Sequence, residues 1–467
     1  MKKFLRYILS GIGAIIALLI VAVFVCLKPL DTTAYQLTDF YKKEVAVINA
    51  IPNSNAAIPA RSDDQSGGKN PPSELEVGWS SVNLLPPFTT PIAIDAHRGG
   101  KHFEGVHDSI YIRAFVFKAG GKKIAYISAD LLIIPPTVAK IFDTLLMREG
   151  FDRRNIYFTA THTHTSLGAW HDSYVGEIFA GKYDPRVPIH IAHCMADAII
   201  SAEKKCSPAK IGYAEIPTSK LVFNRLVKEK GKVDSLLRIV KIEKTSGEKA
   251  AIITFAAHCT VFHKNMMRIT GDWGGLMMDQ LDTSGKINFA SFSAGSVGSH
   301  GPFEVTKDQE KESKYMADHV VQIVLANFGS IKVGNVNFIN MQHVPLYLRE
   351  PEIRISQNII IRPWLFKKLF GDEPSYINTL QIGDIYFAGT PCDFSGELDY
   401  ALDSAARQDN LHLLVTSFNG GYIGYVTDSK WYKMNTYETR TMGWFGPGNG
   451  DYFSEVITKL MTKTKVH

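Results

Sequence analysis

An uncharged, mostly aliphatic run of 20 residues, from position 8 to position 27, constrains this chain more than any other feature of its sequence. As a helix, such a run rises about 30 Å, which is enough to cross a bilayer. A cleaved signal peptide is the alternative, but the run is long for a signal core, and Val23-Phe24-Val25 lacks the small residues of a cleavage site. We therefore expect an uncleaved transmembrane signal-anchor over residues 1–30.

Charges on the two sides of this run predict its orientation. Lys2, Lys3 and Arg6 precede it, whereas Lys28 is soon followed by Asp31. The positive-inside rule keeps the more basic flank in the cytoplasm, which places the rest of the chain outside, in a periplasm or at the cell surface. The expected protein is single-pass and membrane-anchored. Its net charge of +5 is mild and its basic residues are scattered among acidic ones, so nucleic acid is not an expected partner.

Beyond the anchor, composition predicts a linker and one folded domain. Residues 31–74 are the expected linker, with a short amphipathic helix within 31–50 and a stretch rich in Asn, Ser, Gly, Pro and Asp at 52–73. Strand-like and helix-like segments alternate after it, which predicts a single α/β domain over 75–467 with a mixed β-sheet core flanked by helices. Strands are expected at 77–79, 111–118, 123–129, 155–160, 210–216, 237–242, 250–257, 287–292, 333–347, 379–388 and 411–416, and helices at 136–148, 185–204, 304–327, 394–407 and 451–461.

Two histidines follow the apolar strand at 155–160, in the segment Thr161-His162-Thr163-His164. On an extended backbone, positions i and i+2 point to the same side, so both imidazoles would emerge on one face at the carboxyl end of a strand. Active sites of α/β proteins lie at such ends. Neutral imidazole suits zinc, so this spacing indicates a metal site. Two polar histidines in a loop are the alternative.

Two further strands end in groups that can bind zinc. The strand at 250–257 is followed by His258, for which a simple hydrogen bond at a strand end is the alternative role. The strand at 384–389 is followed by Thr390-Pro391-Cys392-Asp393, for which the alternative is that Asp393 caps the next helix. An open zinc site needs three or four protein ligands, and its zinc activates water for attack on a carbonyl carbon. The three strand ends together predict a zinc hydrolase.

The same residues belong to a series of segments that resembles the neutral, non-lysosomal ceramidase family from residue 77 to about residue 460. The resemblance covers the family's N-terminal catalytic domain only, without its C-terminal β-sandwich. The segments are Glu104-Gly105-Val106-His107 followed by Arg113-Ala114-Phe115-Val116, Thr159-Ala160-Thr161-His162-Thr163-His164, Asn224-Arg225, Phe255-Ala256-Ala257-His258, Thr390-Pro391-Cys392-Asp393-Phe394 and Gly421-Tyr422-Ile423-Gly424-Tyr425, in the family's order.

The resemblance implies a zinc ion held by two histidines, a carboxylate and a tyrosine. These ligands fall on His162, His258, Asp393 and Tyr425, with aspartate where the family has glutamate, so the carboxylate reaches one methylene less far.

The resemblance also places His164, Arg225 and Tyr437 near the scissile amide. Arg225 and Tyr437 would donate hydrogen bonds to the developing oxyanion, and His164 would relay a proton. Core aromatic residues are the alternative for the two tyrosines, and a surface ion pair is the alternative for Arg225.

One departure concerns a serine that the family holds essential. The aligned stretch is Gly295-Ser296-Val297-Gly298-Ser299-His300, with Gly298 at the serine's place. The serine is dispensable here, or Ser296, Ser299 or His300 replaces it, or ceramide hydrolysis is lost.

The function that these features predict is a zinc amidohydrolase acting on ceramide or a related N-acyl lipid. One alternative is a degenerate family member that binds lipid or envelope components. The other is a metal hydrolase of a non-lipid amide or ester, such as a peptidoglycan fragment.

Overall fold

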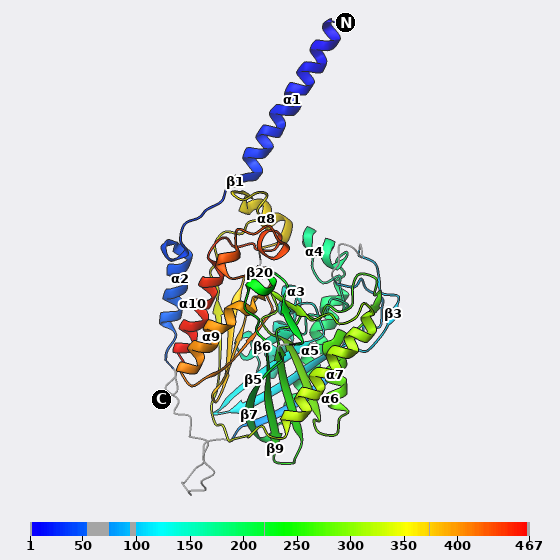
Figure 1. Cartoon of the computed structure of the whole chain (residues 1–467), viewed down its shortest axis with the longest axis vertical. Helices are drawn as coiled ribbons and strands as arrows, with labels where there is room; N and C mark the ends of the chain where they lie inside the picture. Colours follow the sequence, from blue (N-terminus) through cyan, green and yellow to red (C-terminus); the bar gives the residue numbers. More distant parts are fainter. Residues whose placement is uncertain (1, 54–73, 94–99, 219, 373, 465–467) are drawn as a thin grey trace.

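The computed structural model describes residues 2–53, 74–93, 100–218, 220–372 and 374–464. One long helix stands away from a body of sheets and helices (Figure 1). The body has a mixed β-sheet core with helices on its outer faces, which confirms the predicted α/β class.

Within the described residues, eight strands form the larger sheet, in the order β12-β10-β9-β7-β2-β4-β5-β6. The pairs β10–β12 and β5–β6 are parallel and the other pairs are antiparallel, so the sheet is mixed. The strands are β2 (Glu76–Asn83), β4 (Tyr111–Ala119), β5 (Lys122–Ala129), β6 (Ile156–Ala160), β7 (Ser207–Pro217), β9 (Leu236–Lys244), β10 (Lys249–Phe255) and β12 (Phe289–Ala294).

A second sheet has the order β14-β16-β17-β19, formed by Ile339–Pro345, Tyr376–Ile382, Ile385–Gly389 and His412–Thr416. The single strand predicted at 379–388 is wrong, because β16 and β17 are two antiparallel strands of a hairpin. The chain reverses at Gly383, whose φ of 62° lies in the left-handed region. A Gly-Asp pair between two apolar runs is typical of such a turn, and here it is Gly383-Asp384. The prediction joined the two apolar runs into one strand and overlooked this turn.

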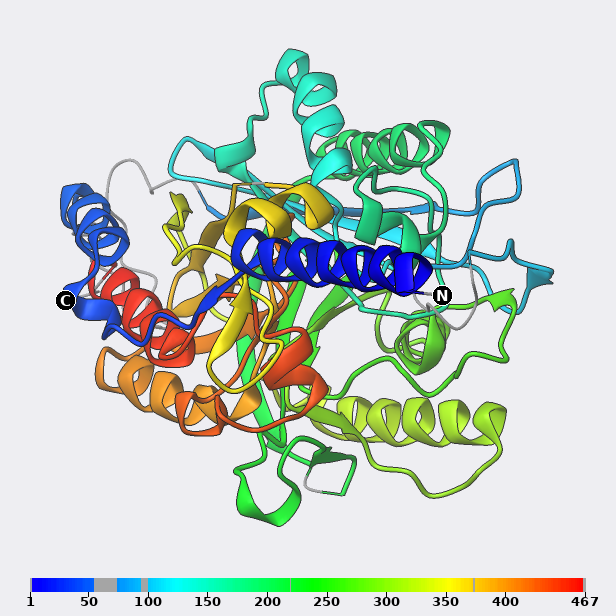
Figure 2. The same cartoon turned by 90° about the horizontal axis from the view of Figure 1, so that it is seen from above.

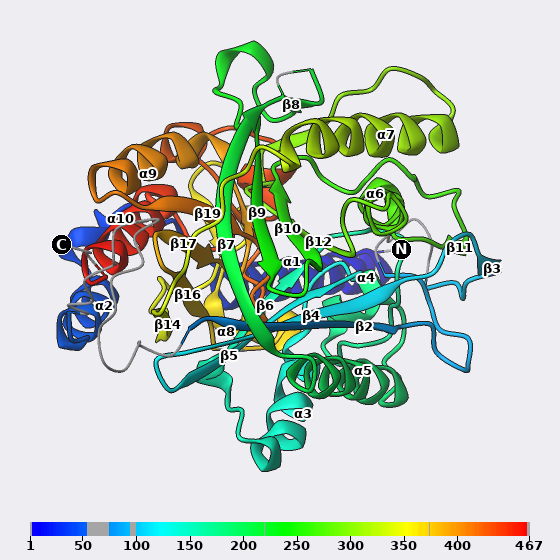
Figure 3. The ribbon, with the colours of Figure 1, turned by 90° about the horizontal axis from the view of Figure 1, so that it is seen from below.

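The two sheets pack face to face, and helices cover their outer faces (Figures 2 and 3). Phe115 and Phe117 of β4 belong to the core between the sheets, whereas Ala114 and Val116 face the helices. Both faces of the larger sheet are therefore buried, which explains why its strands read as continuous apolar runs. Helices α3 (Pro136–Leu146), α5 (Arg186–Glu203), α6 (Asp272–Asp282) and α7 (Gln309–Phe328) cover the larger sheet, and α2 (Asp39–Ala50), α9 (Gly396–Gln408) and α10 (Asn449–Thr462) cover the smaller one.

The segment predicted as a linker is partly folded onto this body. Helix α2 lies against α10 and β14, and Ile48 is buried in the same core cluster as Tyr452 and Phe453. Buried Glu44 accepts a hydrogen bond from the backbone N–H of Tyr347 over 2.8 Å. The predicted amphipathic helix is thus part of the folded unit, because its apolar face finds a partner there, whereas residues 54–73 of the predicted linker lie outside the described residues.

The expected N-terminal apolar helix is present as α1 (Lys2–Cys26). By length and composition, its residues from Phe4 to Cys26 are sufficient to cross a membrane, and none of that stretch is buried against the body. At Leu27 the chain passes directly into β1 (Leu27–Pro29), which pairs with β15 (Ile359–Ile361).

Replacing Ile48 by alanine tests whether α2 stabilises the body. We expect Ile48→Ala to lower the free energy of unfolding by roughly 2–4 kcal/mol, because the substitution leaves a cavity in a closed core. The urea midpoint of the full chain in detergent measures this change. Asn49→Ala, on the exposed side of α2, is the matched control and should have little effect. Equal midpoints for the two variants would mean that α2 adds nothing to the fold.

Candidate active site

The three strand ends that the sequence singles out meet at one point. His162 follows β6, His258 follows β10, and Asp393 begins β18 (Asp393–Phe394), just after β17. The Oδ1 atom of Asp393 lies 3.4 Å from Nε2 of His162 and 3.3 Å from Nε2 of His258. All three side chains are buried. The helix-cap alternative for Asp393 is wrong, since Ser395 provides the N-cap of α9.

His162 and His164 come together by a different route from the one that the sequence predicts. The strand ends at Ala160, and His162 has a φ of 62°, so the backbone is not extended there. This turn brings Nε2 of His164 within 3.2 Å of Nε2 of His162. One ring nitrogen from each of His162, His164 and His258 lies within 4.8 Å of the others, so these histidines could hold a metal ion.

Backbone carbonyls fix the orientation of two of these rings. The Nδ1 atom of His162 lies 2.7 Å from the carbonyl oxygen of Leu132, and Nδ1 of His258 lies 2.7 Å from that of His300. A carbonyl oxygen only accepts, so each Nδ1 carries the proton and donates. Each Nε2 therefore turns an unprotonated lone pair toward Asp393, as in metal sites where the second ring nitrogen is held by a carbonyl.

This arrangement leaves three acceptors facing one another. Nε2 of His258 and Oδ1 of Asp393 are buried and have no hydrogen-bond partner among the described residues. Lone pairs at such distances repel unless a cation or a proton lies between them, and a buried acceptor without a partner costs about 1–3 kcal/mol. The donor set is thus suited to a cation, and two imidazoles with one carboxylate are ligands that zinc accepts.

The protonation states agree with ligand chemistry. Burial and then the Arg225 guanidinium lower the pKa of His258 to about 3, so its ring is neutral at neutral pH. Burial raises the pKa of Asp393, and only positive charge or donors beside it, such as protonated imidazoles at His162 and His258, outweigh burial and lower this pKa. A bound cation would act in the same way. Burial, followed by the same two imidazoles, lowers the pKa of His164. The cluster therefore offers neutral imidazoles and an anionic carboxylate.

The remaining predicted residues lie beside this cluster. The parallel pairing of β18 with β20 (Tyr425–Val426) aligns Tyr425 with Asp393. Arg225 donates from Nη2 to the hydroxyl of Tyr425 over 3.0 Å, and its Nε lies 3.5 Å from Oε1 of Glu438. The ring of Tyr437 meets that of Tyr425 edge-on, with centroids 5.6 Å apart. The structure thus brings all the predicted site residues together, while their catalytic and ligand roles stay predictions.

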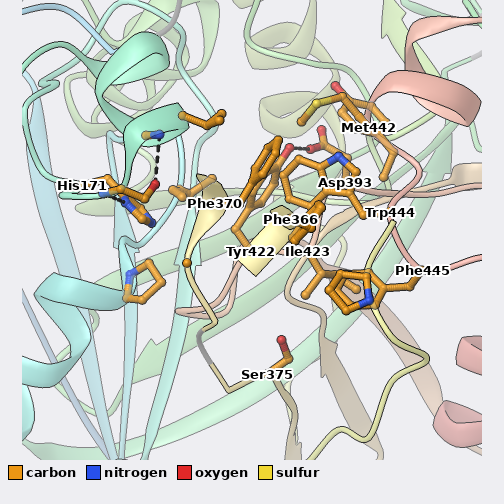
Figure 4. Close-up of a pocket in the computed structure, with 18 of the residues that line it drawn as sticks. His171, Phe366, Phe370, Ser375, Asp393, Tyr422, Ile423, Met442, Trp444 and Phe445 are labelled. Atoms are coloured by element: carbon orange, nitrogen blue, oxygen red, sulfur yellow. Dashed lines mark hydrogen bonds between the residues drawn. The ribbon is translucent and has the colours of Figure 1, made fainter. Parts of the chain in front are cut away.

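Two contacts of the cluster were missed in the sequence. Tyr422 donates its hydroxyl to Oδ2 of Asp393 over 2.8 Å (Figure 4), and the ring of Phe418 stacks on that of His162 with centroids 4.1 Å apart. Tyr422 belongs to the same five-residue segment as Tyr425, so its closeness to a predicted ligand could have marked it as a residue of the site. Nothing in the sequence distinguishes Phe418 from an ordinary core residue.

A cavity of about 710 Å³ leads from the cluster to the surface. His162, His164 and Asp393 line one part of it, and Tyr437, which is 46% exposed, lines it as well. The other walls are mostly apolar and come from α4 (Tyr174–Ala180), α8 (Pro363–Phe370) and neighbouring loops (Figure 4). They include Leu132, Ile133, Val175, Phe179, Leu346, Leu348, Phe366, Phe370, Ile423, Met442, Trp444 and Phe445.

Gly298 packs behind the cluster, against the backbone of β18. Its N–H donates to the carbonyl of Phe394 over 2.7 Å, and a Cβ atom built on it would lie 2.3 Å from the carbonyl oxygen of Asp393. Real Cβ atoms do not approach backbone so closely, so a serine does not fit here without moving Asp393. Among the described residues, Ser296, Ser299 and His300 are buried and do not line the cavity. The Ser299 hydroxyl forms hydrogen bonds with Nδ1 of His300 and with the hydroxyl of Ser395.

Adding one methyl group at Gly298 tests this packing. Gly298→Ala is expected to lower the free energy of unfolding by about 1–3 kcal/mol, because the methyl group overlaps the backbone beside Asp393. Gly301→Ala is the matched control, since its added Cβ would come no closer than 3.5 Å to any neighbour. Thermal unfolding of both variants measures the difference. If Gly298→Ala proves as stable as Gly301→Ala, the glycine is not required by β18.

Comparisons with known proteins agree with the fold and with the expected resemblance. The sequence model described as neutral/alkaline non-lysosomal ceramidase, N-terminal, matches residues 98–299. The neutral ceramidase structure from Pseudomonas aeruginosa is 15% identical and has a TM-score of 0.74, with 83% of this chain and 74% of that chain covered. A ceramidase complexed with C2 gives 15% identity and a TM-score of 0.75, with 83% and 75% covered. No curated protein matches in sequence. The chain is therefore similar to the neutral/alkaline non-lysosomal ceramidase family over residues 98–299, and most of its length has the neutral ceramidase fold.

Proposed function

We propose that this chain is a zinc-dependent amidohydrolase that cleaves the N-acyl amide of ceramide or a related lipid, and that α1 anchors it in a membrane with its active site outside the cytoplasm. One observation carries the proposal. Nε2 of His162, Nε2 of His258 and the carboxylate of Asp393 converge in a buried cluster, beside a largely apolar cavity.

His162, His258 and Asp393 would hold the zinc, with Tyr425 as a fourth ligand. Zinc in an open site of this kind activates water and polarises a carbonyl oxygen. The aspartate is shorter than the glutamate that the family resemblance implies, but β18 and the end of β10 lie close enough to bring its oxygen within 3.3 Å of His258. The shorter side chain is therefore compatible with the site.

Arg225, Tyr437 and His164 would act on the substrate itself. The Arg225 guanidinium is charged, lines the cavity and is already held against Tyr425, so it can donate to an oxyanion without reorganising. Tyr437, which also lines the cavity, would donate a second hydrogen bond. The lowered pKa of His164 leaves its ring neutral, and a neutral ring in contact with the cavity can accept a proton and return it to the leaving amine.

The cavity favours a substrate with a hydrocarbon chain. Phe366 and Phe370 of α8, Val175 and Phe179 of α4 and Trp444 give the cavity a long apolar wall, and charged Glu350, Lys367 and Asp372 line it away from the histidine cluster. Each methylene group buried there would contribute about 0.8 kcal/mol to binding. A solved protein of similar fold is a ceramidase complexed with C2, and a ceramidase acts on an N-acyl lipid.

Metal content tests the ligand set. The purified full chain is expected to hold about one zinc ion, because the three converging donors form a single site. His258→Ala and Asp393→Ala should lose most of this zinc by elemental analysis. His190→Ala, a histidine that is bonded to the carbonyl of Leu84, should keep it. Zinc absent from the unaltered chain, or retained in His258→Ala, would contradict the proposed ligands.

Turnover of defined amides tests the substrate class. We expect release of fatty acid from a fluorescent ceramide, and loss of this release when a chelator removes the metal. Arg225→Gln should lower kcat by roughly 10²–10³, since it removes an oxyanion donor. Cleavage of short soluble amides alone would favour the non-lipid hydrolase. Ceramide binding without turnover in the zinc-loaded protein would favour a degenerate member that only binds lipid.

A further inference from the structure

The end of α1 is bound directly to the body of the protein. Cys26 is the last residue of α1 and Leu27 the first of β1, so no spacer separates them. The carbonyl of Cys26 accepts a hydrogen bond of 2.7 Å from the N–H of Arg362, and the N–H of Leu30 donates to the carbonyl of Asn358 over 2.8 Å. These contacts fix where the body begins relative to α1 (Figure 1).

The element that receives α1 also forms a wall of the cavity. Arg362 precedes α8, and the Trp364 indole of α8 donates to the carbonyl of Val25 over 3.2 Å. Further along the same helix, Phe366 and Phe370 line the cavity. Eight helical residues rise only about 12 Å, so the cavity wall begins within that distance of the end of α1.

A continuous apolar cluster runs along this short path. Leu27 packs against a cluster of side chains that contains Phe366, Met442 and Trp444, and all three of these also line the cavity. The first residue after α1 and the cavity wall are thus parts of one packed unit, which leaves little freedom for the body to swing away from the membrane end.

The outer surface beside this wall exposes apolar and aromatic side chains. Trp364 is 48% exposed on α8, and on the adjacent α4 Tyr174 is 65% and Ile178 is 43% exposed. Lys368 of α8 is exposed as well. Tryptophan, tyrosine and lysine are the residues that gather at the boundary between lipid and water. We call the exposed surface of α4 and α8 the rim.

We propose that the rim rests in the headgroup layer of the bilayer that α1 spans, so that a lipid moves sideways from that leaflet into the cavity. The proposal rests on the proposed function for the lipid that enters, and on the junction of α1 with β15 and α8 for the contact with the membrane. The geometry favours a bilayer as the partner of the rim. Arg362 and Trp364, at the start of α8, bond to the carbonyls of Cys26 and Val25, and so hold the rim beside the end of α1.

Spin labels on the full chain in liposomes test the membrane contact. Cys26→Ser and Cys206→Ser remove the partly exposed cysteines, and single labels are then placed by Ile178→Cys, Lys368→Cys or Ser246→Cys. Ser246 is exposed in the turn before β10, at the opposite end of that strand from His258, and is the matched control. We expect labels at positions 178 and 368 to collide several times more with oxygen, relative to a water-soluble nickel chelate, than the label at 246.

Two results would overturn the membrane contact. One is a nickel accessibility at positions 178 and 368 equal to that at 246. The other is spin–spin broadening between chains labelled at these positions, which would mean that a second copy covers the rim. Resistance to alkaline carbonate extraction reports separately that α1 is inserted. These measurements need no turnover, so they stand even if the proposed hydrolysis fails.

Vesicle mixing tests the route of the lipid. We expect ceramide in the same liposomes as the protein to be cleaved several times faster than ceramide in separate liposomes at equal total concentration. Equal rates would overturn sideways movement. Absence of cleavage in both, together with oxygen-rich labels at 178 and 368, would contradict the proposed function and leave the rim contact intact.

Discussion

The opposition of three buried acceptors, on His162, His258 and Asp393, is the constraint on which the rest of the site depends. The two rings cannot relieve it by rotating, because the carbonyls of Leu132 and His300 hold their other nitrogens. The carboxylate is held by the hydroxyl of Tyr422. The neighbouring backbone thus keeps these acceptors facing one another, and a cation or a proton between them would offset their repulsion.

The site joins the two halves of the chain. His162 and His258 follow strands of the larger sheet, whereas Asp393 and Tyr425 lie on short strands that follow the smaller sheet. The segment that matches the family's sequence model, residues 98–299, therefore contains the histidines but neither the carboxylate nor the tyrosine. Packing between the two sheets completes the cluster, so the fold of the second half is as necessary to this arrangement as the histidine motif.

The sequence predicted most strands of the two sheets, the long helices except α6, and the positions where polar groups follow apolar strands, but not the short helices α4 and α8 that line the cavity. It was not sufficient for their geometry. His162 turns into the left-handed region, which side chains rarely adopt, so the alternation argument placed the two histidines together for the wrong reason. The carbonyls of Leu132 and His300 act through backbone atoms, which every residue has, and so leave no mark on the sequence. Docking of α2 depends on a partner surface more than 300 positions away, at Tyr347 and Tyr452.

With α1 as the proposed membrane anchor, its direct junction with β1 would make the orientation of the body depend on the thickness of the bilayer. A transmembrane helix that is longer than the hydrocarbon layer tilts, and one that fits stands upright. With a flexible spacer, the tilt would end at the membrane surface. Here the hydrogen bonds of Cys26 and Leu30 join the helix to the body, so a tilt of the helix would tilt the whole body by a similar angle. The body would thus have different orientations relative to the membrane surface in thin and in thick membranes.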